Sequence, residues 1–191
     1  QYQQAHQLAP FIDRYERELA RALFFQTQSF ASSQSFEERQ KFQARFTQAI
    51  GHAIGATRLG PERSENWANL GDLYQLMVNF TTDAPEAALQ AYREARDRDP
   101  LNPAYLEQIG KLHILIADRM QPVLGSKDTE ARLRAQERIQ YELQHAEQAF
   151  TNALQLKSDY SPAQYHLGIL YERQDRLSQA VQTLETVLQA H

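Results

Sequence analysis

The sequence has no cysteine among its 191 residues, which excludes disulfide bonds, thiolate zinc sites and cysteine nucleophiles. A chain without cysteine tolerates an oxidising compartment as well as a reducing one, so this absence leaves the location open. No stretch approaches the roughly 18 apolar residues that a membrane helix needs. The longest uncharged run, 22–36, is interrupted by glutamines and serines. We therefore expect no membrane contact within this segment.

Recognisable catalytic patterns are also missing. The sequence has no nucleophile elbow, no glycine-rich phosphate loop and no metalloprotease helix motif. None of its six histidines follows another at three or four residues, so no helix-borne metal site is visible. We predict that the chain is not an enzyme and carries no catalytic residue, cofactor or metal. The net charge of −4 and the pI of about 5.9 argue against nucleic acid as a partner.

A spaced pattern of small and bulky residues is present instead. Its clearest copy fits W-x2-L-G-x2-Y and continues with an alanine, a tyrosine, a second alanine and a proline. Similar copies surround Gly110 and Gly168, and a weaker one surrounds Ala20. This pattern resembles the tetratricopeptide repeat, a helix–turn–helix unit of about 34 residues. The residues of the clearest copy are Trp67, Leu70, Gly71, Tyr74, Ala88, Tyr92, Ala95 and Pro100.

The resemblance implies an all-α fold, a right-handed α-solenoid of TPR-like helix hairpins that forms one domain over 1–191. Glycine inside a helix costs about 1 kcal/mol against alanine, a cost that is tolerable where a neighbouring helix crosses closely. We therefore expect the hairpins to meet around Gly71, Gly110 and Gly168. The predicted units are a half repeat at 1–10 and helix pairs at 13–61, 64–100, 103–158 and 161–191. The predicted helices after the half repeat are 13–30, 36–59, 64–79, 84–98, 103–120, 128–157, 161–173 and 177–190.

The first three predicted pairs exceed the family's repeat length, and the spacing inside each helix core is intact. The extra residues should therefore lie between the first and second helix of a pair. Pro122 and Gly125 break the third pair, and the following stretch 128–157 has neither proline nor glycine, which predicts a helix of roughly 45 Å. Leu133, Ile139 and Leu143 form an apolar seam on it. The seam leaves open a solvated helix or a coiled-coil contact with another chain.

The resemblance implies a non-catalytic scaffold that binds a protein or peptide partner on the inner face of its first helices. A stripe of arginines at the N-terminal end could grip carboxylates, although neighbouring acidic residues make a solvated face the favoured interpretation. Asn79 begins an N-glycosylation triplet, which matters only if the chain is exported. The expected protein-binding residues are Arg14, Arg17, Arg21, Phe24, Asp72, Gln75, Glu107, Lys111, Tyr165 and Ile169.

Two other functions stay open. The last helix has an apolar outer face, so the chain could self-associate through the solenoid ends and helix 128–157 into a head-to-tail filament or extracellular fibre. The enlarged insertions also resemble those in repeat tails of bacterial envelope proteins of the O-antigen-ligase type. That resemblance implies an accessory domain of a larger membrane-anchored cell-envelope enzyme, and an extracytoplasmic or cell-surface location. The start at Gln1 is expected for a processed chain or a piece of a longer one.

Overall fold

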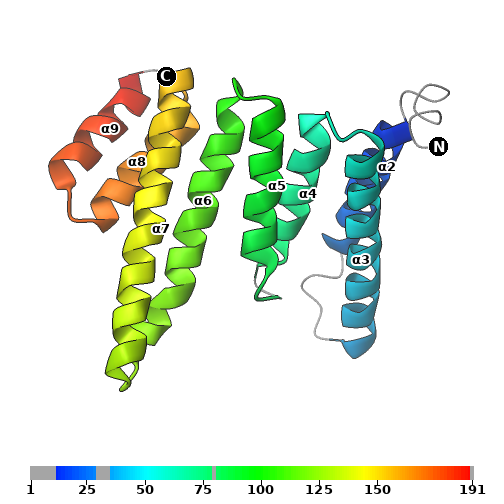
Figure 1. Ribbon diagram of the computed structural model, residues 1–191, viewed down its shortest axis with the longest axis horizontal. Helices are drawn as coiled ribbons and strands as arrows, with labels where there is room; N and C mark the ends of the chain where they lie inside the picture. Colours follow the sequence, from blue (N-terminus) through cyan, green and yellow to red (C-terminus); the bar gives the residue numbers. More distant parts are fainter. Residues whose placement is uncertain (1–11, 29–34, 79–80, 190–191) are drawn as a thin grey trace. The chain divides into compact units, whose positions relative to one another are not determined.

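Eight α-helices and one 3₁₀ helix make up the described part of the computed structural model, residues 12–28, 35–78 and 81–189 (Figure 1). No β-strand occurs in these ranges. The chain divides into two compact units, residues 1–99 (unit 1) and residues 100–191 (unit 2). The predicted all-α fold of helix hairpins is confirmed within each unit. One continuous solenoid over 1–191 stays a prediction, and the predicted half repeat 1–10 lies outside the described residues.

Unit 1 consists of two helix hairpins. Helices α2 (Ile12–Gln28) and α3 (Phe36–Leu59) form the first, and α4 (Ser64–Leu76) and α5 (Ala84–Arg98) form the second. Small residues face one another in the core, so the helices approach closely around a few large side chains. The buried cluster comprises Ala20, Phe46, Ala49, Ala53, Leu70, Leu73 and Ala91.

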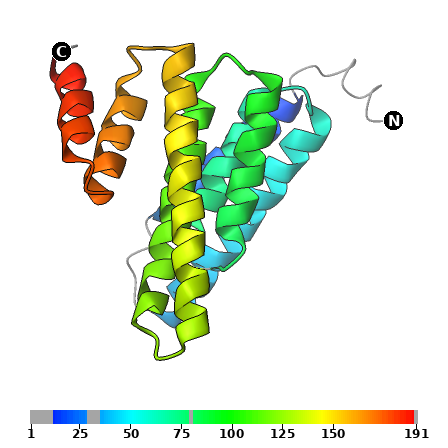
Figure 2. The ribbon, with the colours of Figure 1, turned by 60° about the vertical axis from the view of Figure 1, so that its left-hand side comes forward.

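Unit 2 also has two hairpins, of very different length. Helix α6 (Pro103–Met120) continues through the 3₁₀ helix η1 (Gln121–Gly125) into α7 (Thr129–Leu156), and α8 (Ser161–Arg173) pairs with α9 (Leu177–Gln189). The tip of the α6–α7 hairpin therefore extends past α8 and α9 (Figure 2). The extra residues of this pair lie between its first and second helix, as predicted. The buried cluster comprises Leu106, Ala146, Phe150, Ala153, Ala163, Leu167 and Leu170.

The three helical glycines of the repeat pattern lie where the two helices of a hairpin touch. A Cβ atom added to Gly71 would lie 3.0 Å from the ring of Tyr92, and one on Gly110 would lie 2.7 Å from Cζ of Phe150. On Gly168 it would lie 2.6 Å from Cγ of Leu184. Real Cβ contacts avoid such distances, so only glycine fits there without movement of the neighbour. The predicted close helix crossings at these glycines are confirmed, and each lies between the two helices of one hairpin.

Helix ends follow local sequence signals. The side chains of Asn102 and Asp128 accept hydrogen bonds from backbone N–H groups of the first turns of α6 and α7. The predicted bounds 36–59, 84–98, 103–120 and 161–173 agree with the structure, and the described ends of the other helices differ by one or two residues. The predicted helix residues 29–30, 79 and 190 lie outside the described ranges. No helix within the described ranges is both long enough and apolar enough to cross a membrane.

Candidate protein-binding surface

A buried carboxylate organises the face of unit 2 that α6 and α8 share. The Glu107 side chain is only 6% exposed, and its Oε1 lies 3.1 Å from Nε2 of His166 and 3.6 Å from Nζ of Lys111. Its Oε2 accepts a hydrogen bond of 2.8 Å from the amide of Gln108. Burying a carboxylate is costly unless it is paired and hydrogen-bonded, and these three partners meet that need. The contact between Glu107 and His166 joins two consecutive repeats.

Aromatic rings surround this carboxylate. The ring of His166 stacks on Phe150 with centroids 5.7 Å apart and meets Tyr165 edge-on at 5.4 Å. Burial raises the pKa of Tyr160, and the negative charge of Glu107 raises it further. Tyr165 itself is half exposed, so it presents a large amphipathic surface beside a charged pair.

Four of the predicted binding residues belong to unit 2. Glu107 and Lys111 form one ion pair. The ring of Tyr165 contacts the ring of His166, which in turn contacts Glu107. Ile169 is partly buried one turn after Tyr165 on the same helix. Sequence reasoning missed His166 because it sought histidines three or four residues apart. The available signal was its place directly after a position already projected onto the inner face.

In unit 1, two predicted binding residues hold their own hairpin together. The hydroxyl of Tyr92 on α5 donates a 2.5 Å hydrogen bond to Oδ1 of Asp72 and lies 3.1 Å from Oε1 of Gln75. The Tyr92 ring is buried against Gly71. Asp72 and Gln75 therefore position the aromatic ring that fills the crossing of α4 and α5.

The three arginines of the predicted stripe on α2 have different surroundings. Arg17 donates a 2.9 Å hydrogen bond to Oδ1 of Asn66 on α4, whereas Arg21 pairs with Glu18 on its own helix at 3.5 Å. Arg14 is exposed. Phe24, also predicted to bind, packs on the core of unit 1 and meets the ring of Phe46 edge-on at 6.2 Å.

A buried polar junction explains the task of Arg17. The amide of Asn66 lies 2.9 Å from Oδ2 of Asp13 and 3.1 Å from the carbonyl oxygens of both Ala56 and Gly60. Asp13 is fully buried and also pairs with Arg63 at 3.1 Å. The backbone N–H groups of Gly60 and Arg63 also donate to these two carbonyl oxygens, so the amide of Asn66 adds a second hydrogen bond to each at the end of α3. It ties together α2, the end of α3 and the start of α4.

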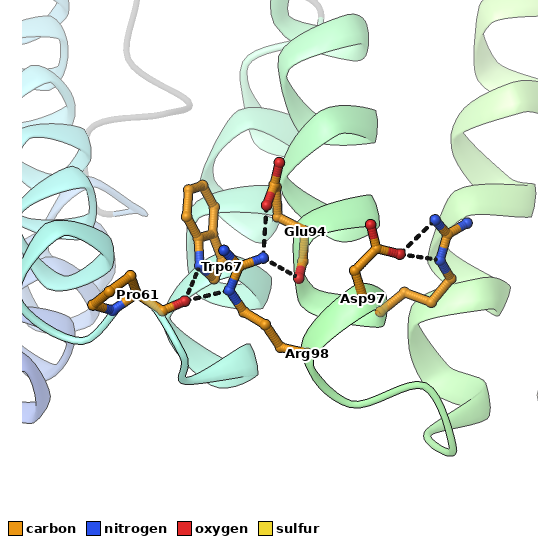
Figure 3. A network of polar contacts seen from close by, with 6 residues as sticks. Pro61, Trp67, Glu94, Asp97 and Arg98 are labelled. Carbon is orange, nitrogen blue, oxygen red and sulfur yellow. Dashed lines mark hydrogen bonds and ion pairs between the residues drawn. The ribbon is translucent and has the colours of Figure 1, made fainter.

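A second network joins the α3–α4 turn to α5 (Figure 3). The indole of Trp67 donates a 2.8 Å hydrogen bond to the carbonyl of Pro61, to which the Arg98 guanidinium also donates. The guanidinium carbon of Arg98 lies 4.7 Å from the centroid of the Trp67 ring, and its Nη1 is 2.6 Å from the carboxylate of Glu94. Trp67 of the repeat pattern and Pro61 of the α3–α4 turn are thus linked both directly and through Arg98.

The α6–α7 hairpin contains a buried histidine–glutamate pair. Nδ1 of His113 lies 2.5 Å from Oε2 of Glu142, and both side chains are almost completely buried. Arg138 pairs with the other oxygen of Glu142 at 2.5 Å, and the ring of His145 lies 5.4 Å from that of His113. His113 therefore lies in the interior of the α6–α7 hairpin. The described residues contain no group of three or more potential metal ligands, and Asn79 lies outside them.

Comparisons with known proteins agree with this architecture. Residues 138–191, the second half of α7 and the last hairpin, match the family model for the tetratricopeptide repeat. No curated protein matches the chain. The crystal structure of TTC0263, a thermophilic TPR protein of Thermus thermophilus, is 14% identical, with a TM-score of 0.58. That match covers 90% of this chain and 74% of TTC0263.

A second solved structure is a monomeric mutant of IFIT1 with Gppp-AAAA, which is 14% identical and has a TM-score of 0.50. The match covers 98% of this chain but 44% of IFIT1, so this chain spans less than half of that protein. At these identities the similarity concerns the fold alone. The family model thus matches 138–191, and the described helix hairpins have the fold of tetratricopeptide-repeat proteins, with extra residues between the first and second helix of the α6–α7 pair.

Proposed function

We propose that the chain is a non-catalytic scaffold that binds a protein or peptide partner, and that α6 and α8 of unit 2 supply a principal contact surface. The observation that carries this proposal is the half-exposed ring of Tyr165 next to the Lys111–Glu107–His166 cluster. Tyrosine supplies a large contact area at low entropic cost, and the buried Glu107 carboxylate holds the neighbouring Lys111 and His166 side chains beside it. Repeat folds of this kind commonly bind proteins or peptides.

A selection from a random peptide library tests this function. Peptides selected on the immobilised chain should bind Tyr165→Ala at least tenfold more weakly than wild type, the effect of losing one important interface residue. Tyr141→Ala is the matched control, because Tyr141 is 51% exposed and Tyr165 is 50% exposed. The control should bind within twofold of wild type. Equal weakening by both substitutions, or no selected peptide at all, would contradict the proposal.

Self-association is a second candidate function, and the surface of α9 favours it. Leu177, Val181 and Leu188 are 57%, 56% and 78% exposed and lie on one side of a helix whose single charged residue is Glu185. The similar IFIT1 structure is described as a monomeric mutant in which two leucines are replaced by glutamate. Light scattering after size-exclusion chromatography should show a mass that rises with concentration and falls with Leu188→Glu. A monodisperse monomer at every concentration rejects this candidate.

The accessory-domain function and the extracytoplasmic or cell-surface location stay predictions of the sequence. The open reading frame that encodes the chain tests the accessory-domain function, because such a domain requires membrane-spanning and catalytic regions in the same polypeptide.

A further inference from the structure

The extra residues between α6 and the core part of α7, called the insertion below, form a surface hollow. Where η1 leads into α7, an open depression is lined by five residues from these two elements. Four of them recur at i, i+3, i+4 and i+7 along the first turns of α7, so they share one face of that helix. The lining residues are Leu124, Thr129, Arg132, Leu133 and Gln136.

This hollow exists because the long hairpin extends beyond the rest of unit 2. Helix α7 has 28 residues and α9 has 13, a difference of roughly 22 Å in length. The apolar seam predicted on α7 divides accordingly: Ile139 is buried and Leu143 packs against the core of unit 2, whereas Leu133 is 56% exposed. Leu124 on η1 is 38% exposed. The lining of the hollow therefore contains two leucines that are exposed at the surface.

The charge at the hollow is positive. Arg134 and Arg138 pair with carboxylates of Glu130 and Glu142 on the same helix, but Arg132 contacts no carboxylate among the described residues. Its Nη2 lies 3.4 Å from the hydroxyl of Thr129, a long hydrogen bond between neutral and charged groups. Arg132 is the one charged residue in the lining, and a guanidinium of this kind binds a carboxylate in a bidentate manner.

We propose that this hollow is a second docking site, which binds a short acidic peptide segment of a partner protein in which a leucine-like side chain neighbours a carboxylate. The aliphatic side chain contacts Leu124 and Leu133, and the carboxylate pairs with Arg132. The amide of Gln136 both donates and accepts hydrogen bonds, which suits a peptide backbone. The site rests on the proposed protein-binding function but uses the insertion rather than the surface around Tyr165.

Fluorescence anisotropy with three labelled synthetic peptides tests this site on the full chain. The probe contains Asp-Leu-Leu-Asp between Gly-Ser flanks, a second peptide has lysine for both aspartates, and a third has serine for both leucines. With titration to about 1 mM, the probe should bind at least tenfold more tightly than either variant. Arg132→Glu should weaken the probe at least tenfold and improve binding of the lysine peptide. Leu133→Ser should weaken the probe to a similar degree.

Arg134→Glu is the matched control, since it changes the net charge equally at a nearby position outside the lining. It should bind the probe within twofold of wild type. Circular dichroism should show all three variants folded, because the substituted side chains are exposed. Absence of probe binding to wild type overturns the proposal, as does an equal effect of Arg132→Glu and Arg134→Glu. Binding of decanoate without binding of the probe also overturns it, in favour of a fatty-acid site.

The two assays distinguish a failure of the proposed function from a failure of the docking site. Library peptides that lose affinity with Tyr165→Ala, together with a probe that does not bind, would support the scaffold function and reject the hollow. A probe sensitive to Arg132→Glu without any peptide dependent on Tyr165 would support the hollow and reject the surface on α6 and α8. Failure of both assays would reject protein binding by unit 2.

Discussion

Replacing Gly110 by alanine should destabilise unit 2, although alanine favours a helix over glycine by about 1 kcal/mol. The added Cβ would lie 2.7 Å from Cζ of Phe150, and that ring is completely buried against neighbours that include His166. Overpacking a filled core costs about 1–3 kcal/mol, and an overlap with a confined ring belongs at the upper end. After the helix-propensity gain is subtracted, we expect a net loss of about 2 kcal/mol.

Gly51 is the control because it is also helical, is exposed and has no atom within 4 Å of an added Cβ. Gly51→Ala should therefore gain about 0.5–1 kcal/mol. Urea denaturation followed by circular dichroism measures both changes. The single tryptophan, Trp67, lies in unit 1, so its fluorescence should follow Gly51→Ala but not Gly110→Ala if the units unfold separately.

A smaller residue at position 150 should restore part of the stability that Gly110→Ala loses. Phe150→Leu destabilises the wild-type core, but combined with Gly110→Ala it should cost less than the two single losses added together. The measured coupling free energy would then assign the loss to this one contact. If Gly110→Ala alone is as stable as wild type, the ring is free to move and the close crossing does not explain the glycine.

Three further predictions concern buried or partly buried polar groups. Asn66→Ala should lower the stability of unit 1 by about 2–3 kcal/mol, because it removes the buried hydrogen bonds of the Asn66 side chain, among them one to the Asp13 carboxylate and one from Arg17; an unchanged midpoint by Trp67 fluorescence would contradict this. Glu142→Ala should cost about 3 kcal/mol, against less than about 1 kcal/mol for Glu130→Ala at an exposed pair, both measured by urea denaturation. Burial and then the charge of Glu147 raise the pKa of Tyr171 above the ordinary value of 10.0. The neutral phenol is favoured in the fold, so this contribution is present below pH 10 and is lost as pH rises through the folded pKa. Above pH 10 the melting temperature of wild type should fall more steeply with pH than that of Tyr171→Phe. Parallel curves of melting temperature against pH would contradict the raised pKa.

The sequence predicted the helices and their crossings because these depend on neighbouring residues and on a spacing that recurs. Gly71 and Tyr92, for example, are a small and a large residue at fixed positions of one repeat, and the structure places them in contact. The pairs that build the site follow no such spacing. Glu107 and His166 come from different repeats with an insertion between them, so their contact depends on how one hairpin packs on the next. The exposure of Leu133, unlike the other apolar residues of the α7 seam, likewise depends on where α6 ends.

Several of the predicted binding residues stabilise the fold, which leaves a smaller surface for binding a partner. Asp72, Gln75 and Arg17 each satisfy a partner inside unit 1, and a residue that supports the fold gains less from binding a ligand because it must first release that partner. Tyr165 is half exposed, and its hydroxyl makes no hydrogen bond to another residue of the described ranges. Arg132 at the tip of the long hairpin contacts a hydroxyl but no carboxylate within the described ranges. Specific contacts with a partner should therefore be sought on unit 2, on α8 and on the insertion that separates α6 from α7.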